Sequence, residues 1–208
     1  PSPPSRSHMA LRIALAIALI AITAASALAG PNDNRLDLYW VDVEGGAATL
    51  LVTPAGETVL IDTGNPGRRD PDRIVKTLTE VAGMKQIDHL IITHFHGDHF
   101  GGSLTLVEQL PIRNLYDNGQ FDGMPDNPGK AYFELKVGQR HVVKPGMTIP
   151  LKQGAAANAP KLTFNFIGGQ KTFIDPPADA ADKVTLCSSG REKDRDGSDN
   201  ANSVVMLV

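Results

Sequence analysis

The sequence predicts a domain of the α/β class, and three observations indicate it. Between Thr58 and Tyr116 the chain alternates segments of strand type with segments of helical periodicity, in the order strand, helix, strand, helix, strand. Strand-like segments also precede this alternation. Apolar residues make up 41% of the 208 positions and charged residues 21%, a composition typical of a folded core. A chain of this length provides one domain, with room for a small additional piece.

The first strands are predicted close together. Residues 36–43 alternate between apolar and polar and are rich in β-formers, and the glycines at 45–46 interrupt this pattern. A second strand is predicted over residues 48–53. The turn at residues 54–56 then leads into a third strand over residues 58–62. Because the connections are short, we expect three consecutive antiparallel strands.

The alternation that follows is defined by its start and stop signals. Asp70–Pro71 predicts the start of a helix, and apolar residues recur at helical spacing until Gly83 ends it. Residues 88–93 are almost continuously apolar, which is typical of a strand buried on both faces. A second helix is predicted over residues 104–110 and another strand over residues 112–116.

Beyond Tyr116 the predicted elements become shorter. Residues 117–130 form a loop, and a short helix is predicted over residues 131–137. Residues 190–200 are rich in charge, and we interpret them as a solvated loop. The remaining strand candidates are residues 142–143, 148–151, 162–167, 183–186 and 202–208.

The ends of the chain predict an exported fragment of a longer protein. Residues 1–8 precede the first methionine and are excluded from the fold as a leader or remnant. Residues 9–29 combine a basic start, an apolar run and an Ala-Leu-Ala end, which predicts a cleaved signal peptide, with a retained membrane anchor as the alternative. The domain, residues 30–208, is then periplasmic or secreted and meets a membrane only through an uncleaved leader. The strand-like end at residues 202–208 has no turn after it, so we expect the domain to continue.

The charge and cysteine counts exclude several functional classes. The chain has 20 Lys and Arg against 23 Asp and Glu, a net charge of -3, so no strong nucleic-acid-binding patch is expected. The single cysteine, Cys187, excludes an internal disulfide framework and a cysteine-based zinc site, and we assign it no role.

Three of the six histidines fall within one short segment, residues 93–102. His94, His96 and His99 surround Asp98, directly after the predicted buried strand and directly before the next helix. Imidazole and carboxylate donors concentrated in this way suit Zn²⁺ or another borderline divalent ion. A polar surface loop is the alternative, and the density of ligand-type residues favours the metal site.

The spacing of these residues predicts two groups of ligands. At an extended strand end, His94 and His96 are two residues apart and point the same way, so both reach one ion. We expect Gly97 to allow a sharp turn, after which Asp98 and His99 project differently and reach a second ion. One turn would therefore supply ligands to both halves of a two-metal site.

This segment resembles the H-x-H-x-D-H signature of the metallo-β-lactamase fold superfamily. Residues 41–46 (V-D-V-E-G-G), 60–64 (L-I-D-T-G) and 87–94 (I-D-H-L-I-I-T-H) match the pattern around that signature. The resemblance is closest to the metal-hydrolase domain of DNA-internalisation competence proteins and is strong over residues 36–116. It implies an αββα sandwich, here truncated before its C-terminal half.

The resemblance also implies a role for each residue. His94 and His96 would bind one metal ion, while Asp98 and His99 would bind the other; the ions would be two Zn²⁺, with Mn²⁺ or Fe²⁺ as alternatives. Asp98 would in addition orient a metal-bound hydroxide for attack on a carbonyl carbon or on phosphorus. Asp62, at the end of the third strand, would orient a ligand from beneath the site, and ordinary strand-end turn chemistry is the alternative.

The chain departs from the family pattern at two places. Residues 44–47 are E-G-G-A where the competence proteins have G-Q-G-D. Family members also use a later bridging Asp and at least one further His, whereas no histidine follows His141 in this chain. His141 lacks ligand context and His89 lies one strand face away from His94, so we interpret both as structural.

Three functions compete. The leading one is an exported metal-dependent hydrolase that acts on a phosphodiester. The second keeps the same fold and acts on a small acyl substrate, as lactamases, lactonases and thioesterases do. The third is a non-catalytic exported protein with a degenerate metal site. The ligands in residues 93–102 do not choose between ester and phosphate, and the acidic balance weighs slightly against nucleic acid.

Overall fold

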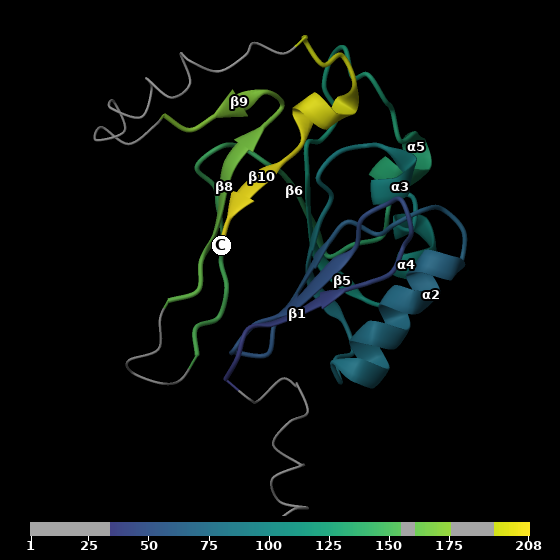
Figure 1. The fold of residues 1–208 in the computed structure, drawn as a ribbon, viewed down its shortest axis with the longest axis vertical. Coiled ribbons are helices and arrows are strands. Elements are labelled where there is room, and N and C mark those ends of the chain that lie inside the picture. Colours follow the sequence, from purple (N-terminus) through teal and green to yellow (C-terminus); the bar gives the residue numbers. More distant parts are fainter. Residues whose placement is uncertain (1–33, 155–160, 176–193) are drawn as a thin grey trace, which may run out of the picture.

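Two β-sheets lie face to face in the computed structural model, which describes residues 34–154, 161–175 and 194–208. The larger sheet has six strands and the smaller sheet has four, and the α-helices gather on the outer face of the larger sheet (Figure 1). The predicted α/β class is therefore confirmed, in the form of a sandwich of two sheets. The predicted strand at residues 183–186, the leader, the signal peptide and Cys187 lie outside the described residues.

The larger sheet runs in chain order from its first strand to its sixth. The first three strands pair antiparallel and the next three join in parallel, which confirms both the predicted meander and the predicted alternation of strands and helices. Its strands are β1 (Asp37–Trp40), β2 (Thr49–Val52), β3 (Thr58–Ile61), β4 (Ile87–Ile91), β5 (Ile112–Asp117) and β6 (Gln139–Val142).

The helices connect the parallel strands. They are α2 (Arg69–Lys76) with the π-helical turn η1 (Thr77–Val81), α3 (Gly97–Phe100), α4 (Ser103–Gln109) and α5 (Lys130–Phe133). Within the described ranges, none of them combines the length and apolar content needed to cross a membrane.

The first predicted helix differs from expectation in its last turn. The hydroxyls of Thr77 and Thr79 donate to the carbonyl oxygens of Arg73 and Val75, at 2.9 and 2.8 Å. Threonine side chains that bond back in this way disturb the helical ladder, so the chain widens into a π turn here. Gly83 ends the segment with a φ of 68°, as predicted.

The smaller sheet is built from the end of the described chain. It contains β7 (Thr148–Ile149), β8 (Phe164–Gly169), β9 (Thr172–Phe173) and β10 (Val205–Leu207). The strand predicted over residues 202–208 is shorter than expected, because a 3₁₀ turn, η3 (Asp199–Asn202), precedes β10. In Figure 1 this turn lies at the same end of the molecule as α3, which carries the histidine motif.

Side chains that alternate along the central strands pack into two separate hydrophobic cores. Leu60 and Leu90 face the helices and pack with Ile74 of α2, whereas Val59 and Ile91 face the smaller sheet. These five side chains are fully buried. Both faces of β4 are covered, as its continuous apolar sequence predicts.

His89 lies in the core between the two sheets and is 3% exposed. Its Nδ1 is 3.4 Å from the hydroxyl of Tyr116, and its Nε2, 3.9 Å from Oε1 of Glu57, has no hydrogen-bond partner among the described residues. Burial lowers the pKa of His89, and the nearby Glu57 carboxylate opposes this only in part. The ring of His141 stacks on the ring of Tyr116, with the two ring centroids 4.6 Å apart. The structural interpretation of both histidines agrees with these positions.

The lowered pKa of His89 predicts a loss of stability in mild acid. Above the unfolded-state pKa of about 6.5 the ring is neutral in both states. As the pH falls below that value, the unfolded chain takes up a proton that the folded chain does not, so the free energy of unfolding decreases. His89→Gln should show a shallower decrease between pH 7 and pH 5, measured by urea unfolding of metal-free protein. Identical pH slopes for the two proteins would contradict the assignment.

Candidate metal centre

The histidine motif follows the carboxyl end of β4. The chain leaves the strand after Ile91 and enters α3 at Gly97, so the four predicted ligands lie on one loop and one helical turn. In a parallel sheet this end of the strands is where ligands bind. The turn that follows β3 packs closely against the end of this segment. A Cβ at Gly102 would lie 2.2 Å from the carbonyl oxygen of Thr63, so no larger residue fits at position 102.

The predicted role of Gly97 is wrong. Gly97 is the first residue of α3, its φ is not positive, and a Cβ added there would meet nothing within 4 Å. The start of the helix itself changes the chain direction, so the turn does not require glycine at this position.

Three imidazoles converge at this turn. Nε2 of His94 lies 3.1 Å from Nδ1 of His96, and the rings of His94 and His99 are 4.0 Å apart. Two nitrogen ligands of one tetrahedral Zn²⁺ are about 3.3 Å apart, given Zn–N bonds of about 2.0–2.1 Å. The His94 and His96 nitrogens therefore lie as close together as two ligands of a single ion.

Asp62 supports this cluster from beneath. It is 2% exposed and has a φ of 61°, a left-handed backbone that is uncommon for a residue other than glycine. Its Oδ1 accepts a hydrogen bond from the backbone N–H of Thr93, and its Oδ2 accepts one from the Thr93 hydroxyl, both at 2.8 Å. The same Oδ2 lies 2.8 Å from Nδ1 of His99.

These contacts assign the ring protons. The Thr93 hydroxyl has one proton and gives it to Asp62, so it accepts the Nδ1 proton of His94 across 3.0 Å. His99 likewise gives its Nδ1 proton to Asp62. The lone pairs of His94 and His99 are then on Nε2, the nitrogen that is free to bind a metal.

A second carboxylate lies within ion-pair distance of His96. Asp126 lies on the loop between β5 and α5, and its Oδ2 is 3.2 Å from Nε2 of His96. An Nε2 proton directed at Asp126 leaves the His96 lone pair on Nδ1, which is the atom that faces His94. The far nitrogens of His94 and His99 are therefore hydrogen-bonded, as those of metal-binding histidines generally are, and the far nitrogen of His96 faces a carboxylate.

The electrostatic environments of the rings differ. Burial lowers the pKa of His94, and the neighbouring His99 adds to this effect. The hydrogen bond to Asp62 raises the pKa of His99. The carboxylate of Asp98 is more open, with 39% of its side chain exposed, and its Oδ2 lies 3.9 Å from Nε2 of His99.

The smaller sheet reaches the motif through residues 199–204. Asp199 is fully buried, and its carboxylate accepts hydrogen bonds from the backbone N–H of Phe95 at 2.6 Å and from the Asn202 amide at 2.9 Å. Ser203 Oγ lies 3.4 Å from Nδ1 of His94. This segment therefore fixes the backbone between His94 and His96.

Sequence reasoning missed Asp126 and treated Asp199 incorrectly. We interpreted residues 190–200 as a solvated loop, but Asp199 at its end is buried in η3. Nothing in the local pattern marks either residue, because both meet the motif only through the tertiary fold.

These residues fit part of a metal centre. Two nitrogens that face each other, a third imidazole and a carboxylate make up the donor set that a borderline divalent ion takes. Across the described parts of the chain, however, no group of three or more His, Cys, Asp or Glu side chains is close enough to hold an ion by itself. The geometry thus provides pairs of ligands rather than a complete site.

A two-sheet α/β fold with this motif beyond a parallel strand defines a class of metal-binding proteins. Residues 41–179 match the family model of the metallo-beta-lactamase superfamily, which covers more than half of the chain. The protein therefore belongs to the metallo-β-lactamase superfamily. The resemblance to competence proteins, which is finer, stays a prediction.

Individual relatives match over shorter stretches. A metal-dependent hydrolase of Cupriavidus metallidurans is 29% identical over 86 residues, 39% of this chain and 26% of that protein. An atrochrysone carboxyl ACP thioesterase of a Cryptosporiopsis species is 33% identical over 89 residues, 42% of this chain and 25% of that protein. A subclass B3 metallo-β-lactamase from a soil metagenome library is 22% identical with a TM-score of 0.43, over 69% of this chain and 52% of that one. The matched segments thus span about a quarter of the two curated relatives.

The contacts of Asp199 predict a stability defect that a second change repairs. In Asp199→Asn a single acceptor oxygen remains for two donors, the backbone N–H of Phe95 and the amide of Asn202, which should lower the free energy of unfolding by about 1–3 kcal/mol. Adding Asn202→Asp exchanges donor for acceptor and should restore most of the loss. Urea unfolding of the two single variants and the double variant checks this. If the double variant is the least stable of the three, the proposed hydrogen-bond pair is wrong.

The contact between Asp126 and His96 predicts an effect on metal affinity. Asp126→Asn removes the negative charge that faces Nε2 of His96, so Zn²⁺ affinity should fall about tenfold, the lower end for such partners, because 47% of the Asp126 side chain is exposed. Calorimetric Zn²⁺ titration of the full chain measures it. Asp122→Asn, on the same loop and also exposed, is the control and should keep the parent affinity. Equal affinities for all three proteins would remove Asp126 from the site.

Proposed function

We propose that this chain carries the histidine motif of an exported metal-dependent hydrolase that acts on an acyl bond. The observation that supports it most directly is the convergence of three imidazoles, of which His94 and His99 are held at their far nitrogens by Thr93 and Asp62, while His96 faces Asp126. His94 and His96 would hold one divalent ion, and Asp98 and His99 would contribute to a second. Zn²⁺ suits these donors, and Mn²⁺ or Fe²⁺ are alternatives.

Each residue has a defined task in this proposal. A bound ion supplies an acidified water and stabilises negative charge that develops on the substrate oxygen. Asp62 keeps the lone pairs of His94 and His99 directed into the site by holding protons on the opposite nitrogens. The Asp98 carboxylate is partly exposed, so it is accessible to a substrate and can accept a proton there. Asp199 holds the backbone on which His94 and His96 are placed.

An acyl substrate is favoured over the phosphodiester that the sequence first suggested. One relative is named as a thioesterase, which cleaves an acyl bond. The pocket beside Asp98 is lined by one basic side chain and three carboxylates. A nucleic-acid strand carries several phosphates, which such an acidic pocket would repel. Export rests on residues 9–29, whose composition is that of a signal peptide.

Metal-dependent ester hydrolysis tests the proposal. The full chain, supplied with Zn²⁺ or Mn²⁺, should hydrolyse 4-nitrophenyl hexanoate faster than bis-4-nitrophenyl phosphate, and chelation should abolish the activity. His96→Ala should reduce the rate by at least about 100-fold, because it removes one of the two facing nitrogens.

The control for His96→Ala is His141→Ala, which removes an imidazole that stacks on Tyr116 in the core. It should retain metal-dependent turnover. Faster cleavage of the phosphate ester would restore the phosphodiester hypothesis. Stoichiometric metal binding without turnover of either ester would instead support the non-catalytic alternative.

A further inference from the structure

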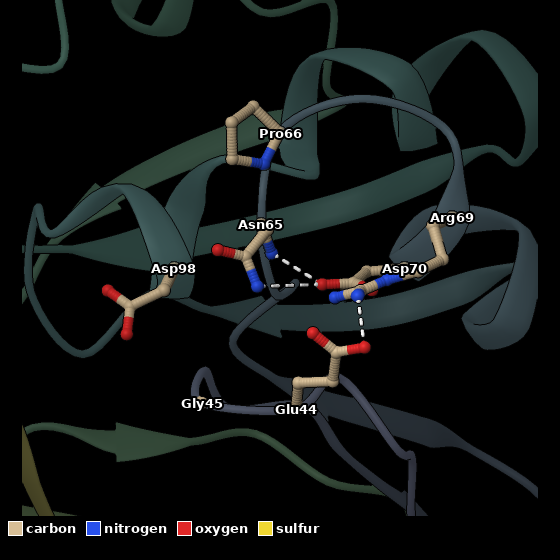
Figure 2. A pocket seen from close by; sticks show the side chains of 7 residues that line it. All are labelled: Glu44, Gly45, Asn65, Pro66, Arg69, Asp70 and Asp98. Carbon is tan, nitrogen blue, oxygen red and sulfur yellow. Dashed lines mark hydrogen bonds and ion pairs between the residues drawn. The ribbon is translucent and has the colours of Figure 1, made fainter.

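A polar pocket of about 420 Å³ opens beside the metal motif. It lies between the turn after β1 and the start of α2, and Asp98 of the metal motif borders it opposite Arg69 (Figure 2). Its walls contain a single basic side chain. The lining residues are Glu44, Gly45, Asn65, Pro66, Arg69, Asp70 and Asp98.

Arg69 is held in place from below. Its Nε donates to Oδ1 of Asp70 at 2.6 Å, and Asp70 is 1% exposed. The other carboxylate oxygen of Asp70 accepts from the backbone and side-chain nitrogens of Asn65, at 2.8 and 3.0 Å. The carboxylate of Asp70 is therefore fully engaged, and it fixes the guanidinium with one edge toward the protein and the other toward the pocket.

The pocket side of Arg69 already binds a carboxylate. Nη1 lies 2.6 Å from Oε1 of Glu44, as Figure 2 shows. Unlike the buried Asp70, Glu44 has 67% of its side chain exposed, and its backbone has a φ of 57°. Glu44 is also one of the residues at which the chain departs from the pattern of the competence proteins. An exposed ion pair of this kind is weak and is readily exchanged.

We propose that Arg69 anchors a carboxylate group of the substrate, and that the Glu44 carboxylate occupies this position when substrate is absent. The inference rests on the proposed hydrolase and adds the substrate class: an acyl compound with one free carboxylate. Replacement of Glu44 by a substrate carboxylate exchanges one negative charge for another, so the pocket gains no net charge. A phosphate dianion or a chain of phosphates would add charge beside Asp70 and Asp98.

A binding experiment tests the anchor independently of catalysis. Metal-free full chain is titrated with monomethyl adipate, which has one carboxylate, and with neutral dimethyl adipate at constant ionic strength. The Nε–H signal of Arg69 is followed by ¹H–¹⁵N NMR. The monoester should give a saturable shift and the diester none. In Arg69→Gln the affinity, followed through the Gly45 amide, should fall about tenfold or more, the loss expected for a charge-assisted hydrogen bond.

Matched variants separate a specific site from general charge effects. Arg68→Gln removes the adjacent arginine, whose side chain is 73% exposed and paired with Asp72, and should leave the affinity unchanged. Glu44→Gln removes the competing carboxylate and should strengthen binding about twofold to fivefold, the range that an exposed ion pair spans. Asp72→Asn removes the same charge elsewhere and should have a smaller effect.

A kinetic comparison tests whether the anchor serves the substrate. With metal supplied, the ratio of kcat/KM for mono-4-nitrophenyl adipate to that for 4-nitrophenyl hexanoate should fall about tenfold in Arg69→Gln and stay constant in Arg68→Gln. Absence of hydrolysis for both esters, with Arg69-dependent binding intact, would overturn the proposed function and leave the carboxylate site standing.

Three results would overturn the inference itself. These are a shift that does not saturate, equal affinities in parent and Arg69→Gln, and Arg69-dependent binding of methyl phosphate without binding of monomethyl adipate. Two of them show that Arg69 does not bind the carboxylate, and the third assigns the pocket to a phosphate ester.

Discussion

The buried carboxylate of Asp62 is the contact on which the geometry of the site depends. It joins the end of β3 to the segment that follows β4, because it accepts from both the backbone and the hydroxyl of Thr93 and from the His99 ring. One side chain thereby sets the proton positions of two imidazoles and the distance between two loops. The left-handed backbone at Asp62 is a local strain that this network offsets.

The second constraint comes from the smaller sheet. The backbone N–H of Val204 donates to the Thr93 carbonyl at 2.8 Å, and Asp199 accepts from Phe95, so residues 199–204 hold both sides of His94. A segment more than a hundred positions away in sequence thus fixes the backbone of the motif. The packing of the two sheets and the placement of the imidazoles therefore depend on each other. A substitution that separates the sheets should also displace the histidines.

The features that depend on neighbouring residues in the chain could be predicted from the sequence. The strands and helices follow from periodicity, and the motif follows from ligand-type residues gathered within residues 93–102. Asp62 was identified through the resemblance to the metallo-β-lactamase signature, which places a carboxylate at the end of the third strand. The roles of Asp126 and Asp199 could not be predicted, since an isolated aspartate in a polar loop has the same local sequence pattern whether it is solvated or buried. The π turn at residues 77–81 depends on where two threonine hydroxyls point, which propensity does not determine.

The charges around the motif indicate why a cation belongs there. Asp62 and Asp199 are both nearly or fully buried, and neither is paired with Lys or Arg among the described ion pairs and hydrogen bonds; their partners are amides, a hydroxyl and imidazoles. Burial of two carboxylates that no Lys or Arg neutralises is costly, and the facing nitrogens of His94 and His96, 3.1 Å apart, bring two lone pairs together when both rings hold their proton on the far nitrogen. A divalent cation held by His94 and His96 would offset both costs. The pocket beside Asp98 is acidic as well, and Arg69 is the single basic side chain of its lining, so an anion bound there has the Arg69 guanidinium as its one cationic partner.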